Sequence, residues 1–167
     1  MATSSVSIRL QPFHGDFVAR LLLCAAAVFL CHQFQWYWLR SITCYWNVVA
    51  DGWLGVHLVR TGSDTVIFRG ELYRYVVSCT IADVWCGAVA FLWDTRRTTA
   101  ENLTRWIALG AGLFFFNVAR LTFSDVMFAA HLPWNLAHNV VSGIAYWMVW
   151  RWLRHDAKQR AHQTAPA

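Results

Sequence analysis

Four long apolar runs constrain the fold of this chain more than any other feature of its sequence. They cover residues 17–39, 79–94, 106–123 and 133–153. About 20 helical residues extend for about 30 Å, which is the thickness of the hydrocarbon core of a bilayer. The runs predict an all-α membrane protein, a bundle of about four transmembrane helices that forms one integral membrane domain, residues 1–167.

The composition agrees with a membrane protein. Only 14% of the residues are charged and 57% are hydrophobic, whereas a soluble domain has about 25% charged residues. The 11 tryptophans and 11 phenylalanines are typical of aromatic belts at membrane interfaces. The net charge of +5 does not indicate a nucleic-acid partner, because Lys158 is the single lysine and the arginines are dispersed along apolar segments.

The segments between the runs predict an outer region. In 41–60, apolar residues recur at helical spacing among polar ones, which predicts an amphipathic helix on or partly in the membrane. After a turn signal, residues 65–68 and 71–77 are rich in β-branched and aromatic residues and predict a β-hairpin or two short strands. Together, residues 41–78 would form an extracytoplasmic amphipathic helix and extended segment.

The two ends of the chain are predicted to be cytoplasmic. Residues 1–16 form a polar lead, and no small-residue cleavage site follows the first apolar run, so we expect no removable signal peptide. Residues 154–167 form a basic, polar tail.

The cationic residues determine the predicted orientation in the inner (plasma) membrane. Positive charge gathers on the cytoplasmic side of membrane proteins. With both termini inside, the cytoplasmic pieces hold Arg9, Arg20, Arg96, Arg97, Arg105, Arg151, Arg154, Lys158 and Arg160. The outer pieces hold Arg40, Arg60, Arg69 and Arg74, balanced by Asp51, Asp64, Glu71 and Asp125.

Five cysteines are present, without a C-x-x-C pair or a His/Cys cluster of zinc spacing, so we expect no metal and no cofactor. Cys24, Cys31 and Cys86 lie in apolar runs, where a thiol behaves as a small hydrophobic group. Cys44 and Cys79 lie outside such runs or at their edge.

Three helices would bring residues suited to thiol chemistry to the outer membrane face. The second span starts near Cys79, the third ends near Arg120, and the fourth holds His138 about one turn inside. A neighbouring histidine or arginine lowers the pKa of a cysteine and favours the reactive thiolate. An arginine can also donate to the oxyanion of a tetrahedral intermediate. Cys79, Arg120 and His138 are therefore the candidate catalytic residues.

Each candidate also has a structural interpretation. Cys79 can be an inert interfacial thiol, and Arg120 can extend to the interface or pair with Asp83. His131 lies closer to the outer surface than His138 and is its rival; we favour His138 because it lies within a helix. Asn117 is interpreted as a helix-packing or orienting amide.

These residues fall in an ordered pattern that resembles the exosortase/archaeosortase family of membrane-embedded cysteine transpeptidases. One departure concerns the residues after the cysteine, where the family commonly has Ser or Thr and then Gly, and this chain has Thr80 and then Ile81. The resembling stretches are Leu54-Gly55, 66–70, 76–81, 117–121 with its Asn-x-x-Arg, and 134–143.

The resemblance implies that Cys79 is the nucleophile and that Arg120 and His138 are its catalytic partners. It implies cleavage of C-terminal sorting signals of exported proteins on the extracytoplasmic face, with transfer of the new C-terminus to an acceptor. Its substrate proteins carry a short motif, a transmembrane segment and a basic tail. The alternative is a non-catalytic exosortase-like subunit that serves as a scaffold in a larger membrane complex. Both interpretations place the chain in the lipid bilayer.

Overall fold

The structure is a computed structural model that describes residues 13–163. Most of the predicted lead 1–16, and the last residues of the predicted tail 154–167, lie outside the described residues. The described part is mostly helical with one small sheet, as predicted. Its elements in order are α1 (Phe13–Cys31), α2 (Tyr37–Trp53), β1 (Val59–Arg60), β2 (Thr65–Phe68), β3 (Glu71–Arg74), the short 3₁₀ helix η1 (Val77–Cys79), α3 (Ala82–Leu92), α4 (Thr99–Ala129) and α5 (Trp134–Gln163).

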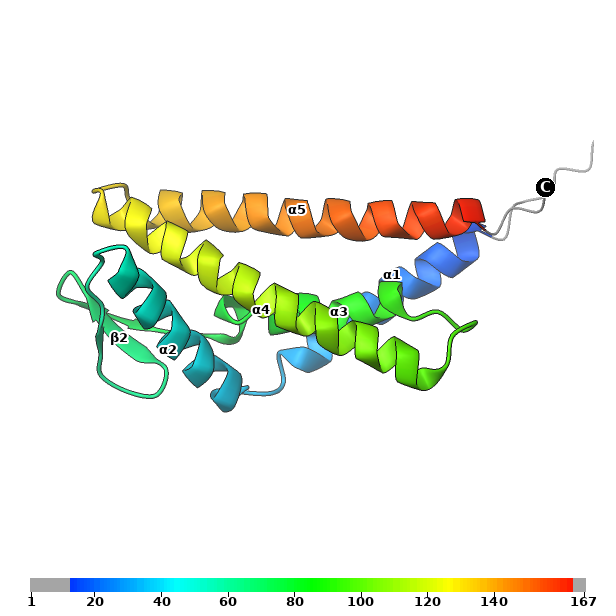
Figure 1. Cartoon of the computed structure of the whole chain (residues 1–167), viewed down its shortest axis with the longest axis horizontal. Helices are drawn as coiled ribbons and strands as arrows, with labels where there is room; N and C mark the ends of the chain where they lie inside the picture. Colours follow the sequence, from blue (N-terminus) through cyan, green and yellow to red (C-terminus); the bar gives the residue numbers. More distant parts are fainter. Residues whose placement is uncertain (1–12, 164–167) are drawn as a thin grey trace, which may run out of the picture.

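The molecule is elongated, and its two ends differ (Figure 1). Helices α4 and α5 follow the long axis. One end carries α2, the sheet and the turn between α4 and α5. The start of α1, the loop between α3 and α4, and the end of α5 lie at the opposite end. The two ends of the described chain are therefore on the same side, away from the sheet.

The predicted first span, 17–39, was wrong as a single helix. Helix α1 ends at Cys31 and α2 begins at Tyr37, with Trp36 in the left-handed backbone region at φ 49°. The indole Nε1 of Trp36 donates to the carbonyl of Cys31 over 2.8 Å. This turn redirects the chain at the point where the polar residues His32 and Gln33 interrupt the apolar run.

Full-length spans are fewer than the predicted four. Within residues 13–163, α4 alone is long and apolar enough to cross a membrane by its length and composition. The predicted span 106–123 lies inside α4, and the predicted span 133–153 lies inside α5 except for Pro133, which precedes the helix. The predicted span 79–94 contains α3, which has 11 residues and therefore extends about 17 Å at 1.5 Å per residue. Helix α3 and the apolar part of α1 are too short to meet the same criterion.

The predicted hairpin is present and belongs to a three-stranded antiparallel sheet of order β1-β2-β3. Thr65 pairs with Arg74 and Phe68 with Glu71. The two-residue connection has positive φ at both Arg69 and Gly70, as the tight turns that suit twisted hairpins require. Strand β1 was missed, because the predicted helix 41–60 ends at Trp53 in the structure and the chain then turns.

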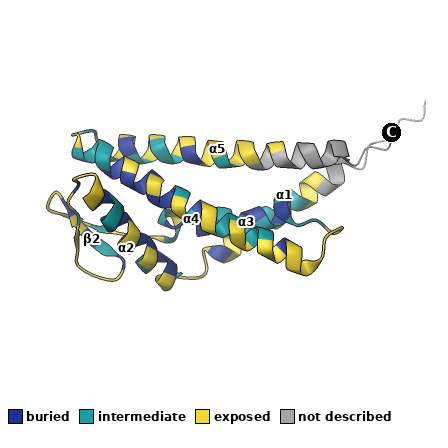
Figure 2. Ribbon diagram, in the orientation of Figure 1, coloured by how far each residue is buried: buried dark blue, intermediate teal, exposed yellow. Residues whose placement is uncertain are grey.

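Helix α2 has the reverse of the amphipathic arrangement of a soluble protein. Its buried residues include Arg40, Thr43, Asn47 and Asp51. Most of its large apolar residues face outward, with Trp53 78% exposed, although Leu39 and Cys44 are buried. Large apolar side chains are also exposed on α1, α4 and α5, and Figure 2 shows the exposed stretches along these helices. The polar face of α2 therefore packs against the protein.

Close contacts hold α3 between α1 and α4. A Cβ at Gly87 would lie 2.9 Å from Cys24 Sγ on α1. On the other side, the rings of Trp85 and Trp106 stack with centroids 4.4 Å apart. Each indole also donates to the backbone carbonyl of the other residue over 2.9 Å. These contacts fix the position of the segment that precedes α3, which contains Cys79.

Candidate functional site

A cavity of about 200 Å³ lies where the sheet meets α4 and the start of α5. Cys79 and His138 line the same cavity, although 59 positions separate them in the chain. Asp125, Tyr75 and Trp134 also line it. Two of the three candidate catalytic residues thus meet at one cavity, and the third, Arg120, is connected to it through hydrogen bonds.

Cys79 ends a tight turn that links the sheet to α3. Its backbone N–H donates to the carbonyl of Val76 over 2.9 Å, and the N–H of Thr80 donates to that of Val77 over 2.9 Å. The hydroxyl of Thr80 donates to the Val77 carbonyl over 2.6 Å and accepts from the N–H of Ala82 over 3.3 Å. The link between the predicted extended segment 71–77 and the predicted span that starts at Cys79 is therefore a 3₁₀ turn that Thr80 stabilises.

Ile81 completes this turn in a conformation that favours glycine. Its φ is 59° and its ψ is 13°, in the left-handed region, which costs a residue with a Cβ about 1–2 kcal/mol. Its side chain is 5% exposed. The family that the chain resembles commonly has glycine at this position, and glycine is the residue that such a backbone favours. Buried packing of the Ile81 side chain opposes the strain.

Arg120 is buried and held by two polar side chains. Its Nε and Nη2 donate to Asn117 Oδ1 over 3.2 and 3.0 Å, and its Nη1 donates to the hydroxyl of Ser142. Asn117 Nδ2 in turn donates to the backbone carbonyl of Cys79 over 2.6 Å. The predicted role of Asn117 as an orienting amide agrees with this geometry, and a chain of hydrogen bonds joins Arg120 to the turn that carries the thiol.

The predicted pairing of Asp83 with Arg120 was wrong. Asp83 Oδ2 lies 3.8 Å from His32 Nε2, and Arg120 is bonded to Asn117 and Ser142 instead. Arg120 is 6% exposed, so it does not extend to the surface either. Asp83 and Arg120 therefore have different partners.

His138 faces the cavity, whereas His131 does not line it. The imidazole of His138 stacks on the indole of Trp134, with ring centroids 5.1 Å apart and 19° between the planes. Its Nδ1 is buried without a hydrogen-bond partner among the described residues. His131 is exposed, and its Nδ1 lies 3.1 Å from Arg69 Nη2. The geometry therefore favours His138 over its rival.

The expected lowering of the pKa of Cys79 was wrong. Burial raises the pKa of this thiol, and the positive charge of Arg120, which lowers it, is the weaker influence. Cys79 therefore rests as a thiol near neutral pH. A nucleophilic role would require a base that removes its proton during attack.

Sequence reasoning missed a buried polar cluster beside the cavity. Asn47 Nδ2 donates to Asp125 Oδ2 over 2.9 Å and also to Asp51 Oδ2. Asn47 and Asp51 have no exposed surface, and they belong to the face of α2 that packs on the protein. Asn47 and Asp51 are four residues apart, a spacing that indicates a shared polar face on one helix. His138 and Ser142 have the same spacing, and Ser142 is the residue that accepts from Arg120.

No group of three His, Cys, Asp or Glu side chains within residues 13–163 is arranged to hold a metal ion. The chain matches no protein-family model, no curated protein and no solved structure. Its function must therefore be argued from the site.

Proposed function

We propose that this protein is a membrane-embedded cysteine protease/transpeptidase of the exosortase/archaeosortase type. It would cleave C-terminal sorting signals of exported proteins at the extracytoplasmic face of the inner membrane. One observation carries the proposal: Cys79 and His138 line a single cavity, and Asn117 links the Cys79 turn to the buried guanidinium of Arg120. These are the three residues to which the resemblance assigns catalysis.

The distribution of polar and apolar side chains supports a membrane location. Buried polar residues, including Arg40, Asn47, Asn117 and Arg120, gather inside, while Phe29, Phe115 and Trp53 are more than 60% exposed. Lipid is the solvent that favours such an arrangement, because polar groups are costly there and apolar groups are not. We propose that α1, α3, α4 and α5 form the membrane bundle, with the short α3 supported by its neighbours.

The distribution of charge supports the orientation. Arg96 and Arg97 lie in the loop before α4, at the end of the molecule where α1 starts and α5 ends (Figure 1). The sheet and the Cys79 cavity are at the opposite end. With the arginine-bearing loop in the cytoplasm, as the positive-inside rule predicts, the cavity faces outward.

The proposed reaction begins with attack of Cys79 Sγ on the scissile carbonyl carbon. A neutral His138 imidazole takes the thiol proton as the C–S bond forms, and Arg120 stabilises the oxyanion of the tetrahedral intermediate. His138 then returns the proton to the departing amine as the C–N bond breaks. The thioester that remains passes its acyl group to an acceptor nucleophile, whose proton His138 accepts. As the C–S bond breaks, His138 gives that proton to the departing Cys79 thiolate, and the thiol and the neutral imidazole are restored.

Co-expression with a reporter tests this proposal. The reporter carries at its C-terminus a short motif, a hydrophobic helix and a basic tail, and its size is followed by immunoblot. We expect processing by the wild type and loss of processing in Cys79→Ala and His138→Gln. Arg120→Lys should process at least tenfold more slowly, because lysine lacks the planar fork that Asn117 and Ser142 hold.

Cys86→Ala is the matched control, because Cys86 is also half-buried and does not line the cavity. It should process the reporter as the wild type does. Equal processing by Cys79→Ala and the wild type would exclude Cys79 as nucleophile.

The non-catalytic scaffold is the second candidate, and Ile81 favours it. A buried, β-branched residue occupies the position of the glycine, two residues after the thiol. If the protein is a scaffold, neither the wild type nor Ile81→Gly should process the reporter. The same partner proteins should then co-purify with the wild type and with Cys79→Ala from detergent-solubilised membranes.

A further inference from the structure

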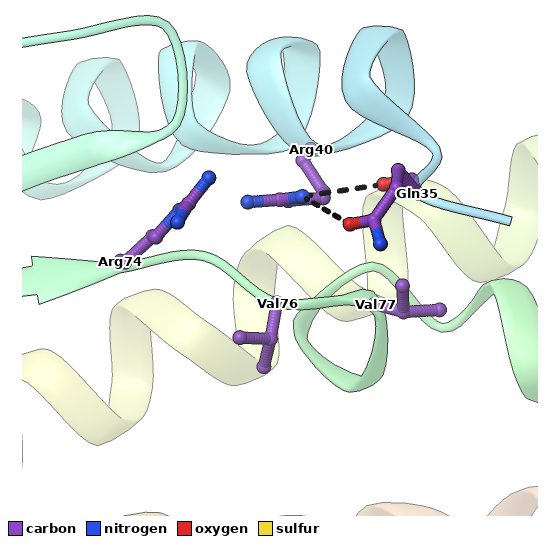
Figure 3. A pocket seen from close by; sticks show the side chains of 5 residues that line it. All are labelled: Gln35, Arg40, Arg74, Val76 and Val77. Atoms are coloured by element: carbon purple, nitrogen blue, oxygen red, sulfur yellow. Dashed lines mark hydrogen bonds between the residues drawn. The ribbon is translucent and has the colours of Figure 1, made fainter. Parts of the chain in front are cut away.

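A second cavity, of about 180 Å³, lies between the start of α2 and the end of β3. Gln35, Arg40, Arg74, Val76 and Val77 line it. Figure 3 shows the guanidinium groups of Arg40 and Arg74 near each other, with the side chain of Gln35 on the other side of Arg40. The cavity combines two cations and an amide with two valines.

Arg40 is the fixed cation of this cavity. It is 3% exposed. Its Nε donates to the carbonyl of Tyr75 over 2.7 Å, its Nη1 to Gln35, and its Nη2 to the carboxylate of Asp64. These bonds hold the guanidinium rigidly at the cavity wall.

Arg74 supplies the charge that is not neutralised. Its Nε lies 3.4 Å from the same Asp64 oxygen that Arg40 contacts, and its side chain is 63% exposed. One carboxylate thus faces two guanidinium groups. No hydrogen bond joins the terminal nitrogens of Arg74, or Nε2 of Gln35, to another described residue. The cavity therefore has one net positive charge and free donors.

The surroundings of the cavity are apolar and aromatic. Val76 is 49% exposed, and Phe34, Tyr37 and Trp38 are each more than 60% exposed beside Gln35 and Arg40 in the chain. Exposed aromatic residues next to cations are typical of the level of lipid headgroups. A ligand here would have an anionic group for the arginines and an apolar part for this surface.

We propose that this cavity binds the phosphate group of an anionic membrane phospholipid. Guanidinium groups bind phosphate through paired N–H donors, and cationic side chains at a membrane surface attract anionic lipid headgroups. The inference rests on the membrane location in the proposed function and not on the chemistry of Cys79. Val76 directly precedes η1, Val77 is its first residue, and Arg74 also lines the Cys79 cavity. A bound headgroup would therefore hold the segment that positions the thiol.

A lipid titration tests the proposal. The full-length protein in a non-ionic detergent is titrated with short-chain phosphatidylglycerol, short-chain phosphatidylcholine or sodium phosphate, and the unfolding temperature is followed. We expect a saturable rise with phosphatidylglycerol and a smaller one with the other two. Arg74→Gln should raise the half-saturating lipid concentration about tenfold, since it removes a charge-assisted contact. The buried Arg40 is left intact so that the fold is kept.

Arg96→Gln is the matched control, because Arg96 is an exposed arginine at the opposite end of the molecule. It should bind phosphatidylglycerol as the wild type does. Equal affinity of Arg74→Gln and the wild type would overturn the proposal. So would a response to sodium phosphate as strong as that to lipid, which would indicate a free-anion site. Loss of processing in Cys79→Ala has no bearing on this titration, so the two proposals fail separately.

Discussion

At the scale of single residues, Ile81 shows the clearest conflict between backbone and side chain. Its left-handed conformation favours glycine, while its 5% exposed side chain is buried against the protein. Burial of an isoleucine contributes about 2–3 kcal/mol, which exceeds the strain of about 1–2 kcal/mol. The turn that carries Cys79 therefore tolerates a residue that its backbone disfavours.

This conflict predicts an unusual order of stability at position 81. Ile81→Gly and Ile81→Ala both lose the buried side chain, but Gly avoids the left-handed strain. We expect Ile81→Gly to be more stable than Ile81→Ala by about 1 kcal/mol, measured by thermal unfolding in detergent. Ser78→Gly and Ser78→Ala, at a position without positive φ, are the comparison pair. If Ile81→Ala proved more stable than Ile81→Gly, the inferred backbone strain at position 81 would be contradicted.

At the scale of helices, Gly110 decides how closely α4 approaches α3. A Cβ at this position would lie 2.5 Å from the indole ring of Trp85. That ring is fixed by its stack on Trp106 and by its hydrogen bond to the Trp106 carbonyl. The indole cannot yield without breaking both contacts.

We therefore expect opposite effects from alanine at two glycines of α4. Gly110→Ala should destabilise the protein by about 1–3 kcal/mol through overpacking. A Cβ at Gly112 would have no heavy atom within 4 Å. Gly112→Ala should therefore be neutral, or stabilising by up to about 1 kcal/mol because alanine favours a helix more than glycine does. Thermal unfolding of both variants in the same detergent measures the difference. Equal unfolding temperatures would show that Trp85 does not pack as described.

The contact between α2 and α4 has a pH dependence of its own. The pKa of Asp51 is raised to about 6. Burial is the main cause, and its effect exceeds the opposing effect of the hydrogen bonds with Asp125 and Asn47. A carboxyl whose pKa is higher in the folded state than in the unfolded chain, where it is about 3.9, stabilises the fold only while it is protonated. Its contribution is complete below about pH 4 and is lost as the pH rises through about 6.

This direction gives a measurable prediction. Between about pH 4 and pH 6, the wild type should lose stability as the buried Asp51 carboxyl gives up its proton. Asp51→Asn, which keeps the shape and remains neutral, should weaken this dependence, and Asp125 of the same cluster remains as a second buried carboxyl. Asp64→Asn is the control, since Asp64 lies outside the Asn47 cluster and faces Arg40. A wild-type profile that rises with pH, or one that Asp51→Asn does not alter, would contradict the buried carboxyl.

At the scale of the whole molecule, the two ends have different chemistry. One end carries the sheet, the Cys79 cavity and the Arg40–Arg74 cavity, and the other carries the loop with Arg96 and Arg97. The exposed apolar faces of the helices lie between them. A membrane that covers these faces would separate the two ends into different compartments.

Single introduced cysteines test this separation. In a background with the five native cysteines replaced, Ser63→Cys lies at the sheet end and Thr95→Cys at the loop end, and both positions are exposed. In spheroplasts, we expect a membrane-impermeant maleimide to label Ser63→Cys and not Thr95→Cys. Permeabilisation should make both react. Labelling of both cysteines in intact spheroplasts would contradict this topology. Release of the protein into the supernatant by a carbonate wash would contradict its integration in the membrane.

The sequence alone was enough to predict the elements whose cause is local. Apolar runs and helical spacing predicted helices within α1, α3, α4 and α5, and the alternating segment around Val66 and Tyr73 predicted the hairpin. The order Cys79, Arg120, His138 was visible as a pattern, and so was the junction that carries the thiol. These features depend on neighbouring residues, which fix φ, ψ and periodicity.

Only the tertiary structure decided which faces and partners these elements use. Periodicity showed that α2 is amphipathic but not that Asn47 and Asp51 face α4, because burial depends on what packs opposite. Arg120 has Ser142 as a partner instead of Asp83 because α5 lies against α4 there. The pKa of Cys79 is raised because residues far along the chain cover it. Contacts, burial and charge are properties of segments brought together by packing; spacing along the chain shows which residues share a helix face but not what packs against that face.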